Sequence, residues 1–218
     1  MVTEVYKKIN GKNCPKKLFS NVRENVTILW SFGKLIEKEN LEGCEMNQST
    51  LVAIITDQTH RALWEVKNVI DCIPEELWNK EYCKMPCWKH AYHMLHSLDQ
   101  WFINPRDINF REPAIHVKDL NNLDVVSEKH LSKDEIISYY CAIKVKIEDY
   151  LMDLTDEQLL QYPPNCEYSK FTLILAQYRH LHSHMGMLMG FIISDTGLWP
   201  RVLGLEKPFP TGEYSKYF

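Results

Sequence analysis

The sequence has little of what marks fibrous, membrane-spanning or nucleic-acid-binding chains. Of its 218 residues, only 8 are glycine and 10 are proline, too few for a fibrous or low-complexity protein. Lys, Glu, Asp or His interrupts every apolar run before it reaches the roughly 20 residues that a membrane helix needs. The net charge is −4, whereas nucleic-acid binding calls for a basic surface that displaces counterions. We therefore expect a packed globular protein with no membrane span and no nucleic-acid partner.

Cysteine is present, but not in the pattern of a disulfide framework. The seven cysteines are an odd number and show no paired spacing, and the apolar stretch near the start is too short for a signal peptide. Cys83 and Cys87 are four residues apart, but no second pair of matching spacing completes a tetrahedral metal site. The pattern predicts a reducing, cytoplasmic location and argues against a cysteine-based metal site.

Residues 1–45 differ from the rest of the chain in charge and periodicity. They carry eight basic and six acidic side chains, a net charge of +2, so that residues 46–218 carry −6. One short apolar stripe, from Val22 to Ile36, is compatible with a helix, and the residues before it show no periodicity. We expect an N-terminal extension over 1–45, partly helical or poorly ordered, and a folded domain over 46–218.

Four later segments show apolar residues at three-, four- and seven-residue intervals, which is the helical pattern. The predicted helices span about 49–73, 87–103, 132–154 and 169–193. Ser132 with Glu135 forms a capping box at the start of the third helix. The fourth helix is apolar on nearly every side, which is typical of a helix buried against several neighbours.

The connection between the second and third helices, from Pro105 to about residue 131, shows no regular pattern. Its length favours a crossover along the outside of a bundle over a tight hairpin. The sequence shows no alternating strand pattern. It therefore predicts an all-α fold, a four-helix bundle with a long crossover connection between helices 2 and 3.

Histidine is concentrated in two places, with six of the nine in two of the predicted helices. His180 and His184 are four residues apart in the fourth helix, so their rings lie one turn apart on one face. That face is otherwise mostly apolar, and two unpaired imidazoles buried there would each cost about 1–3 kcal/mol. A shared divalent ion removes this cost, and imidazole ligands favour Zn, Ni or Fe over Mg or Ca. Hydrogen bonds to other helices are the alternative explanation.

A third ligand for such an ion must come from another helix. The second helix offers His90, His93 and His96, and periodicity does not distinguish them. His182 points about 160° away from the His180/His184 pair and cannot join it.

Two segments resemble a known family. WKHAYHML (residues 88–95) and YRHLHSHMG (residues 178–186) are similar to the aromatic-His segment and the His-x-x-x-His motif of the DinB-like metal-binding four-helix bundles. The similarity covers roughly residues 49–200 in the order and length of the helices. It implies that His93, His180 and His184 are the metal ligands and that the other clustered histidines are bystanders.

Three imidazoles leave at least one position of a divalent ion open, which is typical of catalytic metal sites. Such an ion acts as a Lewis acid toward a water molecule, a carbonyl oxygen or a thiolate. The resemblance implies thiol S-transfer or thiol-dependent isomerisation with a low-molecular-weight thiol. The sequence identifies no catalytic residue. Asp57, His60 and Glu65 are candidate bases, but a solvated position on an outer helix face explains each of them better than catalysis does.

Two functions from different classes remain open. The first is a divalent-metal-dependent enzyme that acts on a small molecule, as a thiol S-transferase or a hydrolase. The alternative is a non-catalytic helical bundle with a structural or vestigial metal site, which acts through partner binding or homodimerisation. An open fourth metal position favours the enzyme, and closure by a fourth protein ligand favours the alternative.

Overall fold

A computed structural model describes residues 50–205 and 207–218 of the chain. Residue contacts divide the chain into two units, Met1–Thr50 and Leu51–Phe218, and all the described helices and strands belong to the second. The predicted N-terminal extension over 1–45 lies outside the described residues.

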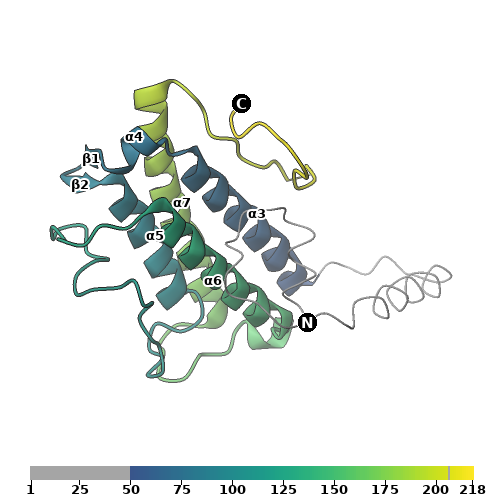
Figure 1. The fold of residues 1–218 in the computed structure, drawn as a ribbon. Coiled ribbons are helices and arrows are strands. Elements are labelled where there is room, and N and C mark those ends of the chain that lie inside the picture. Colours follow the sequence, from purple (N-terminus) through teal and green to yellow (C-terminus); the bar gives the residue numbers. More distant parts are fainter. Residues whose placement is uncertain (1–49, 206) are drawn as a thin grey trace, which may run out of the picture. The chain divides into compact units, whose positions relative to one another are not determined.

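The described chain is mostly helical, which confirms the predicted all-α class (Figure 1). The four long helices lie close to their predicted bounds: α3 (Leu51–Cys72), α5 (Cys87–Trp101), α6 (Lys133–Met152) and α7 (Lys170–Thr196). The short elements between them are α4 (Glu75–Trp78), a hairpin of β1 (Glu81–Tyr82) and β2 (Met85–Pro86), and the 3-10 helix η1 (Asp156–Gln158). None of the helices in this part of the chain combines the length and apolarity needed to cross a bilayer.

Local sequence signals set the ends of the helices. The Ser132 hydroxyl accepts a hydrogen bond from the Glu135 amide, and the Glu135 carboxylate accepts one from the Ser132 amide, which is the predicted capping box. At the start of α7, the Ser169 hydroxyl accepts a hydrogen bond from the Thr172 amide. Gly197 follows α7 with a φ of 72°, a left-handed conformation that favours glycine. These caps define where α6 and α7 begin and where α7 ends.

Each long helix packs against two others. Helix α5 contacts α6 and α7, and α3 contacts the same two helices (Figure 1). The space between them is filled by apolar side chains, among which Val66, Ala91, Leu95 and Ile174 are completely buried. Burial of this apolar surface is the main favourable term in folding.

Residues 103–131, called here the 103–131 connection, join α5 to α6 without forming a helix or strand. Tyr92 lies beside Tyr139, and Phe102 lies beside Tyr150, so α5 and α6 run in the same direction. The chain must therefore travel back along the helices before α6 can begin. Leu120, near the middle of this connection, is completely buried and anchors the segment to the core.

Helix α7 is apolar on nearly every side, and it packs against two neighbours, α3 and α5. Its buried residues form one stripe, made of Leu173, Ile174, Gln177, Leu181, Met185, Leu188 and Ile192. The described helices α3 and α5 cover this stripe, and a residue outside it such as Leu175 is 44% exposed. The apolar composition of α7 did not indicate which of its sides has a neighbour.

The C-terminal segment after α7 lies along α3 (Figure 1). The Asn68 side-chain amide donates hydrogen bonds to the carbonyl oxygens of Arg201, at 2.9 Å, and Lys216, at 3.0 Å. The Leu203 amide donates to the Glu65 carboxylate at 2.8 Å. Two polar residues of α3 therefore hold this segment in place.

Candidate metal centre

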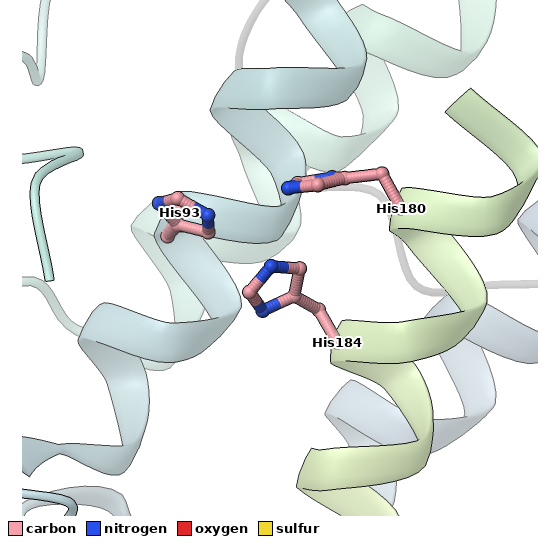
Figure 2. A group of neighbouring side chains, drawn as sticks. All are labelled: His93, His180 and His184. Atoms are coloured by element: carbon pink, nitrogen blue, oxygen red, sulfur yellow. The ribbon is translucent and has the colours of Figure 1, made fainter. Parts of the chain in front are cut away.

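Three histidines from two helices meet between α5 and α7. Figure 2 shows the ring of His93, from α5, facing those of His180 and His184, from α7. The ring centroid of His184 is 4.5 Å from that of His93 and 4.4 Å from that of His180. The centroids of His93 and His180 are 5.4 Å apart. One nitrogen of each ring lies within 4.8 Å of the other two, close enough for one metal ion to bind all three. We call these residues the three-histidine centre.

Helix geometry explains why the rings converge. His180 and His184 are one turn apart on α7, so both rings project from the same side. Helix α5 runs antiparallel to α7, because His90 contacts Phe191 near the end of α7 whereas His93 contacts the two histidines earlier in it. All three rings of the centre are partly exposed, so the site lies at the edge of the helix interface and not in its interior.

The hydrogen bond of His93 defines its tautomer. Its Nδ1 atom lies 2.6 Å from the main-chain carbonyl oxygen of Asn121, and a carbonyl oxygen accepts hydrogen bonds but cannot donate them. Nδ1 therefore carries the proton, and Nε2 keeps its lone pair for an ion. A hydrogen-bond acceptor behind the ring is the usual arrangement for a metal-binding histidine, since it fixes the orientation of the ligand.

The other two rings have unused hydrogen-bonding capacity. The Nδ1 atoms of His180 and His184 are buried and have no hydrogen-bond partner among the described residues. A buried polar atom without a partner costs about 1–3 kcal/mol. No protein group in the described part of the chain occupies these Nδ1 atoms, and one nitrogen of each ring lies within 4.8 Å of the other two, so the residues fit a divalent transition metal.

Burial also affects the protonation of the two α7 rings. Burial, followed by the neighbouring His93 and His180, lowers the pKa of His184 to about 4. The pKa of His180 is lowered in the same direction, first by burial and then by His93. Both rings are therefore neutral near pH 7, and neutral imidazole is the form that binds metal ions.

The remaining clustered histidines lie outside the three-histidine centre. The His90 Nε2 atom donates to the carbonyl oxygen of Tyr82 at 2.8 Å, and the His96 Nε2 atom donates to the Glu112 carboxylate at 2.7 Å. The side chain of His182 is 51% exposed and lies on another side of α7, as its spacing predicted. Of the three candidates on α5, the structure brings His93 to the α7 pair.

The candidate bases on α3 interact with other residues. Asp57 accepts a hydrogen bond at 2.9 Å from the arginine one turn later, and His60 lies 3.5 Å from Glu148 of α6. Glu65 accepts the hydrogen bond from the C-terminal segment described above. None of these contacts involves the three-histidine centre, so the role of general base is not assigned to any of the three.

A cavity of about 380 Å³ lies between α3, α7 and the C-terminal segment. Its lining consists of Gln58, Arg61, Ala62, Glu65, Tyr178, His182, Leu203, Gly204 and Leu205. None of the residues of the three-histidine centre is among them. The cavity is on the His182 side of α7 and is therefore separate from the centre.

Two features of the 103–131 connection were not predicted from the sequence. The first is the Asn121 carbonyl that orients His93, and the second is the contact of Glu112 and His116 with His96. An irregular segment has no periodicity from which the direction of a side chain can be inferred. The four-residue spacing of Glu112 and His116 was the one available signal, and it is weak outside a helix.

No protein-family model, curated protein or solved structure matches this chain. The resemblance to DinB-like proteins therefore rests on the two histidine segments and the order of the helices.

Proposed function

We propose that this chain is a divalent-metal protein of the DinB-like type and that its metal makes it an enzyme acting on a small molecule. The ligands are His93, His180 and His184, and the ion is Zn, Ni or Fe. The reaction is transfer of a low-molecular-weight thiol, or hydrolysis.

One observation carries the metal proposal. Three imidazole nitrogens from different turns and helices converge within 4.8 Å, and two of these rings keep a buried nitrogen without a partner. Histidines buried only for stability normally form hydrogen bonds to protein groups. An imidazole-only ligand set favours a transition metal over Mg or Ca.

The exposure of the rings supports an enzyme. Three protein ligands leave a position for an exchangeable ligand, and the partial exposure of all three rings provides access from solvent. A bound divalent ion supplies Lewis acidity toward a thiolate, a carbonyl oxygen or water. The chain itself contributes orientation, because the Asn121 carbonyl keeps Nε2 of His93 available for the ion.

The packing of the helices supports the same family. Four long helices that each contact two others correspond to a four-helix bundle, and the 103–131 connection between parallel α5 and α6 corresponds to its crossover. This arrangement agrees with the range of roughly 49–200 over which the resemblance extends. A cytoplasmic location remains a prediction from the cysteine pattern.

A non-catalytic role is the second candidate, and the cavity between α3 and α7 favours it. The residues that line this cavity do not include the three-histidine centre, so a molecule bound there would not contact the ion. The metal would then serve stability, and the protein would act through a partner or as a homodimer. Neither role includes a nucleic acid, because the net charge is −4.

Metal analysis of untagged protein tests the metal proposal. Wild type, His93→Ala, His180→Ala and His182→Ala are loaded with Zn or Ni, freed of excess by gel filtration and analysed by elemental mass spectrometry. His182→Ala is the matched control, because it removes a histidine of the same helix that lies outside the centre. We expect wild type and His182→Ala to hold one equivalent of metal more than His93→Ala and His180→Ala hold. Equal metal content in all four proteins would contradict the proposal.

Ligand exchange separates the two candidate functions. Cobalt-substituted wild type and His180→Ala are mixed with a small thiol, and absorption spectra are recorded before and after. An open position lets the thiolate bind, so we expect a sulfur-to-cobalt charge-transfer band that depends on His180. A cobalt-loaded wild type whose spectrum does not respond to the thiol would favour the non-catalytic role.

A further inference from the structure

A second group of potential metal ligands lies where the 103–131 connection passes α5. His96 of α5 and Glu112 and His116 of the connection each place one ligand atom within 4.8 Å of the other two. The Glu112 Oε2 atom is 2.7 Å from His96 Nε2 and 3.7 Å from His116 Nδ1. The two imidazole rings are stacked, with centroids 5.1 Å apart. None of these residues belongs to the three-histidine centre.

We propose that His96, Glu112 and His116 form a second divalent-metal site that takes Zn²⁺ or a similar transition-metal ion. Two imidazoles and one carboxylate are a ligand set that zinc uses in proteins. Zinc lies about 2.0–2.2 Å from nitrogen and oxygen ligands, so tetrahedral ligand atoms are about 3.3–3.6 Å apart. The observed separations of 2.7 and 3.7 Å bracket this range, and small side-chain movements would reach it.

The surroundings of the group are suited to a cation. The side chain of His96 is 2% exposed, whereas that of Glu112 is 46% exposed, so an ion has access from the Glu112 side. Tyr92, which is completely buried, and Phe110 contact the rings and restrict their movement. The Glu112 carboxylate supplies a negative charge that partly neutralises a divalent ion. The three-histidine centre has no negatively charged ligand.

Metal binding requires a change of hydrogen bond at each ring. The His96 Nε2–H group now donates to Glu112, and the His96 Nδ1 atom accepts from the Asn121 side-chain amide at 3.3 Å. Coordination through Nε2 moves the ring proton to Nδ1, and half a turn of the Asn121 amide then presents Oδ1 as its acceptor. The His116 Nδ1 atom exchanges the Tyr92 hydroxyl, now at 2.7 Å, for the ion. Each ring nitrogen that gives up a hydrogen bond therefore gains another partner, whereas the buried Tyr92 hydroxyl loses its bond to His116.

Zinc counting in the full-length, untagged protein tests this site separately from the three-histidine centre. The proteins are wild type, His180→Ala, Glu112→Gln, His116→Ala and the double variant His180→Ala/Glu112→Gln. Zinc alone is the probe, and bound zinc is measured after gel filtration. We expect two equivalents in wild type, one in each single variant and none in the double variant. His130→Ala is the control, because His130 hydrogen-bonds Asn79 and belongs to neither group.

The outcomes of the two metal proposals are distinguishable. If the three-histidine centre does not bind metal, His180→Ala and wild type hold the same amount, and any zinc still depends on Glu112 and His116. The second site would be overturned if His180→Ala binds no zinc and has the same melting temperature as metal-free wild type, because the variant is then folded and still lacks the ion. Glu112→Gln and His116→Ala proteins that both hold as much zinc as wild type would overturn the second site as well. In those cases the three residues form only a hydrogen-bond network that attaches the connection to α5.

Discussion

The Nδ1 atom of His93 lies 2.6 Å from the carbonyl oxygen of Asn121, 28 residues later in the chain. This hydrogen bond links the three-histidine centre to the 103–131 connection, so the orientation of one proposed ligand depends on an irregular segment. The acceptor belongs to the main chain and is present whatever side chain occupies position 121. The protonation pattern of the His93 ring is therefore set before any ion binds.

We expect His93 to be the Nδ1–H tautomer both without metal and with zinc bound. Long-range proton–nitrogen NMR spectra of the histidine rings measure this directly, and His93→Gln identifies the signals by removing them. Asn121→Ala keeps the carbonyl oxygen and should leave the tautomer unchanged. A His93 ring protonated on Nε2 in the metal-free protein would contradict the hydrogen bond described here.

Two adjacent tyrosines of α6 should differ in their contribution to stability. The Tyr139 hydroxyl donates to the buried Asp99 carboxylate at 2.8 Å, whereas the Tyr140 hydroxyl donates to the Leu63 carbonyl oxygen at 2.7 Å. Hydrogen bonds to charged groups contribute about 1.5–3 kcal/mol and neutral ones about 1 kcal/mol. We therefore expect Tyr139→Phe to lower the free energy of unfolding more than Tyr140→Phe does. Urea denaturation of the two variants compares them, and equal or reversed losses would contradict the assignment.

The capping box at the start of α6 gives a third prediction. The Ser132 hydroxyl accepts the Glu135 amide hydrogen bond at 3.3 Å. Ser132→Ala should lower the free energy of unfolding by about 1 kcal/mol, whereas Ser132→Gly should lower it by only a few tenths. Ser138→Ala, an exposed change within the same helix, serves as the reference for general effects of removing a hydroxyl. A Ser132→Ala variant as stable as wild type would show that the cap contributes little.

Glu148 of α6 should make stability fall as the pH rises. Burial raises the pKa of Glu148 above its ordinary 4.5, against the opposing attraction of Lys144 and with a further increase from Asp149. His60 of α3 also faces it at 3.5 Å, and burial lowers the pKa of that histidine. Because the folded state favours the protonated acid, the stability that the group contributes is full below pH 4.5 and is lost as the pH rises through the folded pKa.

The variant Glu148→Gln removes this titration and checks its sign. We expect its melting temperature to exceed that of wild type by more at pH 8 than at pH 5. Glu128→Gln, which changes an exposed residue, is the control and should show the same small difference at both values. A Glu148→Gln protein that loses stability relative to wild type as the pH rises would show that the ion pair with Lys144 outweighs burial.

The helices were predictable because their signals are local. The apolar periodicity and the Ser132/Glu135 capping box depend on residues within a few positions of each other, and both appear in the structure as predicted. The β1–β2 hairpin was not predictable in this way. Its turn residues, Cys83 and Lys84, have φ angles of 53° and 69° without the Asn-Gly or Asp-Gly sequence that usually indicates such a turn.

The three-histidine centre was only partly predictable. The spacing of His180 and His184 gave the pair, but the choice of His93 over His90 and His96 required a family resemblance, because all three lie on one helix at similar intervals. The partners supplied by Asn121, Glu112 and His116 depend on how an irregular segment folds onto α5. Those contacts are set by tertiary packing, for which a single sequence carries no local signal.

A peptide pair copied from α5 and α7 would contain all three histidines of the centre and still be an incomplete copy of it. Without the carbonyl of Asn121, His93 would interconvert between its two tautomers, and only one of them offers the correct nitrogen. The neighbouring Leu120 is completely buried, so the main chain next to that carbonyl is anchored in the core. Transplanting the centre into another scaffold would therefore require a third piece of chain, with its own hydrophobic anchor, in addition to the two helices.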